Sequence, residues 1–239
     1  MKKLSVASSA LASIATLGAL YTSPAAAEVS MNVTAASNYY FRGVSQTFDG
    51  AAIQGGIDYE DASGFYVGAW SSNVDFGDGT SHEIDFYAGF AGDAGGLGYD
   101  IGYLYYAYPD APEDIDFAEV YGEVSYEAFA VGVAVTANSD NDDGLFDTGD
   151  VYTYLSAGFP LSESISLSAT AGFYAFTNDG DPGVGDADYF HFAAGVEKDA
   201  GDFGAVSLNL EFADIDEDEA LGTVNSDDLK FWVGWSKSF

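Results

Sequence analysis

Few side chains in this sequence are suited to catalysis. The chain contains two histidines, His82 and His191, and no cysteine, so it offers neither thiolate nucleophiles nor thiolate metal ligands. Serine and aspartate are common, but no serine stands in the G-x-S-x-G pattern of a nucleophile elbow. We therefore expect that the protein is not an enzyme. We interpret His191 as a polar residue on the lumenal face of a strand.

One acidic segment has the spacing of a calcium-binding loop. Asn141, Asp143, Asp147 and Asp150 fall at ligand positions of such a loop when Ser139 is taken as its first residue. The first and last positions depart from the pattern, because Ser and Asp replace the usual Asp and Glu, and no flanking helices are expected. We keep these four residues as a candidate calcium site, with a solvated acidic loop as the alternative. No cofactor is predicted.

The charge balance excludes one class of partner. The chain has 39 acidic and 6 basic residues, a formal net charge of −33, whereas nucleic-acid binding needs a basic face. Hydrophobic residues make up 48% of the chain and aromatic residues 16%, which is too rich for an acidic disordered protein. The acidic residues must therefore lie on a folded protein.

The first 27 residues have the composition of a secretory signal peptide. Lys2 and Lys3 precede an apolar stretch over 4–20, and three alanines at 25–27 form a small-residue cleavage site. Cleavage would leave residues 28–239 as one domain. No later segment approaches the roughly 18 consecutive apolar residues that a membrane-spanning helix needs.

Apolar and polar residues alternate with a period of two through most of the remaining chain. Val29, Met31 and Val33, for example, alternate with Ser30 and Asn32, which is typical of strands with one apolar face. Twelve segments show this pattern, and we predict strands at about 29–41, 51–60, 65–76, 82–92, 97–108, 115–127, 129–138, 150–159, 164–176, 188–198, 203–213 and 227–239.

The connections between these strands alternate in length. After the odd-numbered strands they are long or acidic, at 42–50, 77–81, 109–114, 139–149, 177–187 and 214–226, and after the even-numbered strands they are short. Barrels of the outer membrane have short periplasmic turns and longer external loops. We predict an all-β, antiparallel up-and-down transmembrane barrel in the outer membrane of a Gram-negative bacterium, with both termini in the periplasm.

A soluble β-sandwich or lipocalin-like barrel is the alternative interpretation of the same strands. Two features favour the membrane. The second row of residues is rich in Gly, Ser, Ala and Tyr besides acids, as suits a crowded lumen. Aromatic residues also gather near the predicted strand ends, as at 39–41 and 231–232, where interfacial girdles lie.

The polar rows of the predicted strands would face the lumen. We predict as pore-lining residues Arg42, Asp58, Glu60, Glu83, Asp85, Asp100, Glu119, Glu123, His191, Glu197, Glu211 and Lys230. Arg42 is the only arginine in the chain and stands at the top of the first predicted strand. Because the first and last strands pair in a closed barrel, we predict that Arg42 pairs with an acid near Asp227 and Asp228 or in the adjacent loop.

Several motifs carry a family resemblance. They are SNYYFRGVSQT (37–47), QGGIDY (54–59), GFYVGAWSSNVDFG (64–77) and EIDFYAGF (83–90). They closely resemble the opening of the TorF-type porins, over about the first third of the mature chain. This resemblance implies an outer-membrane channel and brings no catalytic residues. The last segment ends in Phe239, which resembles the signal read by the barrel-assembly machinery.

The function that these observations predict is passive diffusion of small hydrophilic solutes or ions, with a preference for cations because acids dominate the lining. The alternative is a non-conducting structural or adhesive barrel. A barrel of roughly eight strands has an interior that side chains can fill, whereas one of about 16 or more strands leaves an aqueous channel. A barrel of twelve strands lies between these two cases. The lumenal tyrosines could plug such a barrel, namely Tyr87, Tyr121, Tyr152, Tyr154 and Tyr174. Lumenal glycines favour some open space, namely Gly102, Gly132, Gly172 and Gly195. The expected partners are outer-membrane lipid and lipopolysaccharide, the assembly machinery and small solutes.

Overall fold

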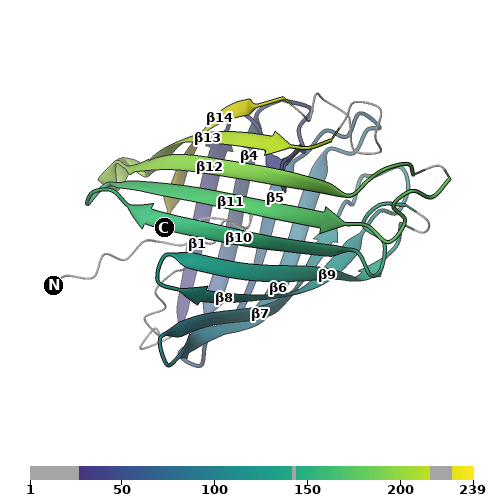
Figure 1. Ribbon diagram of the computed structural model, residues 1–239. Helices are drawn as coiled ribbons and strands as arrows, with labels where there is room; N and C mark the ends of the chain where they lie inside the picture. Colours follow the sequence, from purple (N-terminus) through teal and green to yellow (C-terminus); the bar gives the residue numbers. More distant parts are fainter. Residues whose placement is uncertain (1–26, 142–143, 183, 216–227) are drawn as a thin grey trace.

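Twelve antiparallel strands close into a barrel in the computed structural model of the chain (Figure 1). The structure describes residues 27–141, 144–182, 184–215 and 228–239, so the predicted signal peptide lies almost wholly outside the described residues. The barrel strands are β1 (Glu28–Ala36), β4 (Ala52–Glu60), β5 (Phe65–Asn73), β6 (His82–Ala94), β7 (Leu97–Ala107), β8 (Phe117–Tyr126), β9 (Phe129–Ser139), β10 (Val151–Pro160), β11 (Ile165–Ala175), β12 (Tyr189–Asp199), β13 (Ala205–Ala213) and β14 (Lys230–Ser238).

Each barrel strand pairs with its neighbours in the chain, and β1 pairs with β14 to close the wall. The predicted up-and-down barrel is therefore confirmed. Two short elements lie outside the wall pairing: the two-stranded sheet of β2 (Tyr40–Phe41) and β3 (Val44–Ser45), and the 3₁₀ turn η1 (Gly201–Phe203). Among the described residues, no helix is long and apolar enough to cross a membrane.

The two faces of the wall have opposite character, as the alternation predicts. Apolar side chains point outward and are exposed, for example Ile53 at 63%, Phe190 at 62% and Phe231 at 65%. The alternate residues point inward and are buried, and many of them are polar. An exposed apolar wall around a polar interior is the arrangement of a membrane-spanning barrel, because a soluble barrel would place its apolar row inside.

The long and short connections lie at opposite ends of the barrel (Figure 1). The turns 61–64, 95–96, 127–128, 161–164 and 200–204 are short, whereas 37–51, 108–116, 140–150 and 176–188 are longer. The first and last strands meet at the short-turn end, where the backbone N–H of Phe239 donates to the carbonyl of Met31 at 2.8 Å. Both ends of the barrel chain are therefore on the same side.

The first strand differs from its prediction. It was expected over 29–41, but it leaves the wall at Ala36, and the aromatic residues that follow do not form a girdle. Tyr39 and Tyr40 are only 3% and 5% exposed, because the chain turns into the barrel there. Alternation alone does not distinguish a strand in the wall from a hairpin that continues inward.

We predict that the long connections face the outside of the cell. A protease site inserted into the β11–β12 connection, 176–188, should be cut on intact cells. The same site inserted into the β4–β5 turn, 61–64, should be cut only after the outer membrane is permeabilised. Immunoblotting of the fragments measures both, and cleavage of the 61–64 insertion on sealed cells would show the opposite orientation.

Candidate functional site in the barrel interior

The connection between β1 and β4 carries a hairpin that lies inside the barrel. β2 and β3 pair with Phe41 opposite Val44, and the two residues of the turn, Arg42 and Gly43, have φ angles of +50° and +88°. Positive φ at both positions is the conformation of a type I′ hairpin turn, which glycine adopts freely and arginine only at some cost. The turn therefore holds Arg42 at the tip of the hairpin.

Side chains at the base of the hairpin fix its entry into the barrel. The amide of Asn38 donates to Asp49 Oδ1 at 2.7 Å, and the hydroxyl of Ser45 donates to Asn38 Oδ1 at 2.8 Å. The backbone N–H of Asp75 donates to the carbonyl of Gln46 at 2.8 Å, which ties the hairpin to the β5–β6 connection. The hairpin is thus held at its base as well as at its tip.

Arg42 forms a buried ion pair with Glu119 of β8. Nη1 donates to Oε1 and Nη2 to Oε2, both at 2.7 Å, and the two side chains are 2% and 1% exposed. The Tyr106 hydroxyl donates to Oε2 of the same carboxylate at 3.0 Å, and the Tyr174 hydroxyl approaches Oε1 at 3.4 Å. A two-point pair of this geometry is among the strong hydrogen-bonded contacts of proteins.

Aromatic rings surround the guanidinium. Its central carbon lies 4.1 Å from the ring centroid of Tyr152, 4.5 Å from that of Phe41 and 5.0 Å from that of Tyr174. These distances are within the range of cation–π attraction. We refer to Glu119 with the rings of Tyr106, Tyr152 and Tyr174 as the Glu119 cage, since all four residues are on strands of the wall.

The fit around the hairpin tip leaves no room for a side chain at position 43. A Cβ atom on Gly43 would lie 2.7 Å from Cβ of His191 and 3.1 Å from Cβ of Ala213. His191 in turn shares a hydrogen bond of 2.7 Å between its Nε2 and the Tyr152 hydroxyl. Glycine is therefore required here for space as well as for its backbone angle.

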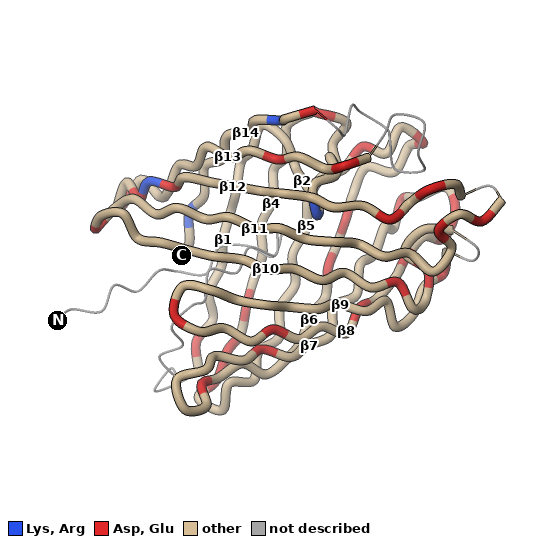
Figure 2. Tube along the Cα trace, viewed as in Figure 1, with Lys and Arg blue, Asp and Glu red and all other residues tan. Residues whose placement is uncertain are grey.

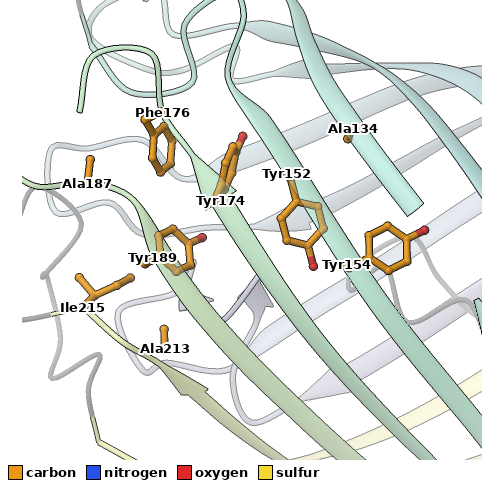
Figure 3. Close-up of a cluster of buried hydrophobic side chains, with 9 residues drawn as sticks. All are labelled: Ala134, Tyr152, Tyr154, Tyr174, Phe176, Ala187, Tyr189, Ala213 and Ile215. Atoms are coloured by element: carbon orange, nitrogen blue, oxygen red, sulfur yellow. The ribbon is translucent and has the colours of Figure 1, made fainter. Parts of the chain in front are cut away.

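More aromatic residues fill the barrel around the ion pair. Phe146, from the β9–β10 connection, has its ring centroid 6.3 Å from that of Phe41 and 5.1 Å from that of Phe117. Figure 3 shows Tyr152 and Tyr174 on neighbouring strands of the same cluster, each almost completely buried. These rings pack against one another and around the ion pair at this level of the barrel interior.

Tyrosine hydroxyls also bind four other lumenal carboxylates. In three of these pairs the tyrosine is on a strand two places along the wall from that of the acid, and in the fourth Tyr39 is on the connection after β1. The hydroxyls donate from Tyr39 to Glu83 at 2.7 Å, from Tyr66 to Asp100 at 2.6 Å, from Tyr154 to Glu123 at 2.5 Å, and from Tyr87 to Asp58. Uncharged tyrosine hydroxyls thus bind these carboxylates, because the described lumen has few basic side chains to pair with them.

Asp85 is a buried lumenal acid without a hydrogen-bond donor among the described residues. Its side chain is 1% exposed, and neither carboxylate oxygen has a hydrogen-bond partner among the described residues. Its cross-strand neighbour Trp70 also has an indole N–H without a partner there. Glu83 and Glu119 are close enough to interact electrostatically with Asp85. Arg42 is the cation beside these three carboxylates, so negative charge is in excess.

The structure places every predicted lining residue on an inward row or on the hairpin. The buried ones are Arg42, Glu83, Asp85, Glu119, His191 and Glu211, and the half-buried ones are Asp58, Glu60, Asp100, Glu123, Glu197 and Lys230. Asp100 and Glu123 are directly opposite each other on β7 and β8. That these twelve residues line a conducting pore remains a prediction.

The predicted partner of Arg42 was wrong. We expected an acid at the seam between the first and last strands, but Arg42 reaches Glu119 on β8 instead. The reason is that Arg42 is at an inward hairpin tip and not at the top of a wall strand. Asp227 and the adjacent loop lie outside the described residues, and the lysine at the seam, Lys230, contacts Asp49 at 3.4 Å.

A group of residues at the long-loop end resembles a catalytic triad in composition only. The hydroxyl of Ser81 donates to Asp110 and lies 2.7 Å from Nδ1 of His82. In a serine hydrolase the histidine contacts the serine and the aspartate through different ring nitrogens. Here the same Nδ1 of His82 faces Ser81 and also lies 3.3 Å from Asp110 Oδ2. The Ser81 hydroxyl lowers the pKa of Asp110 below its ordinary value, which stabilises an exposed loop.

The candidate calcium loop is only partly described, because Asp143 lies outside the described residues. Asp150 turns its Oδ1 to the backbone N–H and hydroxyl of Thr177, both at 2.7 Å, and Asn141 donates to the carbonyl of Leu145 at 2.7 Å. No group of three metal-ligating side chains that could hold an ion occurs in the described part of the chain. Oδ2 of Asp150 has no hydrogen-bond partner among the described residues.

Comparisons with known proteins agree with this architecture. A family model described as "Bacterial protein of unknown function (Gcw_chp)" matches residues 21–239. A search of curated proteins found no significant match. Among solved structures, a KdgM porin has a TM-score of 0.57 at 8% sequence identity, covering 88% of this chain and 99% of its own.

Two further structures show the same fold. A KdgM porin in complex with disordered oligogalacturonate also has a TM-score of 0.57, at 7% identity, over 88% of this chain and 99% of its own. A NanC porin has a TM-score of 0.51 at 8% identity, over 88% and 98% of the two chains. At such low identities the likeness shows a common barrel fold and nothing about solutes.

We predict that Arg42 and Glu119 are energetically coupled. Glu119→Gln should destabilise the barrel by about 3–5 kcal/mol, because it leaves the guanidinium buried without its counter-charge. Arg42→Met combined with Glu119→Leu should cost less than the sum of the single changes. Reversible urea unfolding in lipid vesicles measures these differences.

The matched control for this cycle is Glu197→Gln, which makes the same change on a half-buried inward residue of β12. It should shift stability by no more than about 0.5 kcal/mol. Additive effects of the Arg42 and Glu119 changes would show that the pair is not formed.

Proposed function

Since the chain belongs to the Gcw_chp family, whose description assigns no function, we propose from its barrel that it is an outer-membrane porin for passive diffusion of small hydrophilic solutes and cations. The observation that carries this proposal is the closed wall with an apolar outside and a polar, acidic inside. The likeness to porin structures and the resemblance of residues 37–90 to TorF-type porins support the same function. The Gram-negative outer membrane is its proposed location, with the termini in the periplasm.

The preference for cations follows from the charges on the inward rows. Figure 2 shows acidic residues along the strands and loops and few basic ones. In the described lumen the basic residues Arg42 and Lys230 are both paired, with Glu119 and Asp49. Asp58, Asp100 and Glu123 each accept a hydrogen bond from a tyrosine hydroxyl, and none of the three has an ion pair in the described lumen. A lumen with uncompensated carboxylates attracts cations and repels anions.

The negative charge of the lumen also argues against carrying over the ligand of one porin of the same fold. That KdgM structure contains oligogalacturonate, a polyanion. An acidic lumen would repel a polyanion, so we do not extend this ligand to the present chain. The hairpin narrows the lumen at the level of Arg42, and we propose that only small solutes pass it.

The test is the reversal potential across a KCl gradient in a planar bilayer, with a chelator present to remove divalent cations. We expect a cation-selective potential that decreases as salt rises, because the Debye length falls from about 30 Å at 0.01 M to about 3 Å at 1 M. Asp100→Asn with Glu123→Gln should weaken the selectivity, since these two residues face the lumen on adjacent strands.

The control is Glu127→Gln, which changes an acid in the short β8–β9 turn, outside the strands, and should leave the potential nearly unchanged. An anion-selective potential would contradict the acidic-lumen proposal. No current above the lipid background would contradict the porin and favour a non-conducting barrel.

A further inference from the structure

We propose that the Glu119 cage is a binding site for organic cations that carry a guanidinium group, and that the chain's own Arg42 occupies it in this structure. The proposal deepens the porin function by naming a solute class, and it rests on that function only for the route by which a solute reaches the cage. Four observations support it: the origin of the cage residues, their geometry, the surrounding charge and the way in which Arg42 is delivered.

The cage belongs to the wall and not to the hairpin. Tyr106 is on β7, Glu119 on β8, Tyr152 on β10 and Tyr174 on β11, and the hydrogen-bond ladders of the barrel fix these strands. The hairpin contributes only Arg42 and the ring of Phe41 to this contact. Withdrawal of the hairpin would therefore leave a complete site on the wall.

The geometry of the cage matches a planar, forked cation. Both oxygens of Glu119 accept from Arg42 at 2.7 Å, one from each terminal nitrogen, and the rings of Tyr152 and Tyr174 lie 4.1 and 5.0 Å from the guanidinium carbon. A guanidinium satisfies both contacts at once, whereas an ammonium has one nitrogen and cannot form two parallel N–H···O bonds from separate nitrogens. The hydroxyls of Tyr106 and Tyr174 orient the carboxylate for this contact.

The charge around the cage favours a cation over a neutral molecule. Glu83, Asp85 and Glu119 are all 1% exposed, and Arg42 is the cation among them in the described structure. Asp85 has no hydrogen-bond partner on either oxygen there, so no neutral donor of the described residues competes with a cation for this side chain. Removing Arg42 without replacing it would leave these buried carboxylates uncompensated, which is costly.

The conformation of the turn that carries Arg42 allows a solute cation to compete with Arg42 for the cage. Arg42 is held at φ +50° in its turn, a conformation that costs a non-glycine residue free energy. The covalent link gives Arg42 a high effective concentration at the cage, so a free cation should bind the intact protein weakly. Binding should become visible when the arginine side chain is removed.

The experiment uses the full barrel with Arg42→Ala, purified in detergent, and methylguanidinium chloride as the probe. Calorimetric titration and the shift of the thermal unfolding midpoint report binding directly, without any need for current. We expect saturable binding to the variant that is at least about tenfold tighter than that of methylammonium, and none for N-methylurea, which has the same planar shape without charge. The wild-type protein should bind methylguanidinium at least about tenfold more weakly than the variant.

Two further variants keep the outcome decisive. Arg42→Gln also removes the guanidinium but keeps a longer side chain, and it replaces Arg42→Ala if that variant does not fold. Adding Glu119→Gln to either variant should abolish binding. Equal binding of methylguanidinium and N-methylurea, no binding to either vacated barrel, or binding that survives Glu119→Gln would each overturn the proposal. A barrel that binds methylguanidinium but carries no current would contradict the porin and leave this site established.

Discussion

The buried pair between Arg42 and Glu119 is the interaction on which the interior of this barrel depends. The chain has 39 acidic residues and one arginine, and this arginine is buried inside the barrel. Because an unpaired charge in a protein interior is costly, the pair draws the hairpin of β2 and β3 into the barrel. The aromatic cluster around Phe41 and Phe146 then packs on that hairpin.

Tyrosine and glycine explain how so acidic a lumen is built. Tyrosine supplies hydroxyl donors to carboxylates without adding charge, and its ring needs space on the neighbouring strand. Cross-strand glycines provide it: Gly132 is opposite Tyr154, and a Cβ there would come within 2.2 Å of the tyrosine ring. The same pairing joins Gly68 to Tyr87. The inward face of the wall is therefore lined in part by tyrosine rings that lie over glycines, and tyrosine hydroxyls bind several of its acids.

The sequence predicted the wall well and the interior poorly, for physical reasons. Alternation with period two reports which face of a strand meets lipid, so the strands, their number and the inward position of Glu119 follow from it. Lumenal glycines such as Gly102 and Gly132 favour open space in the lumen when only the sequence is considered. In the structure they lie beneath the rings of Tyr121 and Tyr154. Alternation does not tell whether a glycine faces water or a ring.

The hairpin was missed because its residues continue the pattern of the first strand. Tyr39 and Phe41 extend the apolar row of β1, and only the pair Arg42–Gly43 carries the signal of a two-residue turn. The contact between Arg42 and Glu119 joins residues far apart in the chain, and local pattern carries no information about it. Arg42 is conspicuous in the sequence as the only arginine of the chain, but no local feature of the sequence indicates Glu119 as its partner.

The central claim is that the hairpin lies inside the barrel with Arg42 at the Glu119 cage. Photo-crosslinking from p-azidophenylalanine at position 41 tests it most directly, because Phe41 contacts Tyr106 of the wall and Phe146 of the β9–β10 connection. In intact outer membranes the structure predicts crosslinks to the peptides that contain Tyr106 or Phe146, identified by mass spectrometry. Crosslinks only to lipopolysaccharide or to solvent, with none to the barrel, would show that the hairpin extends outward and would contradict the account.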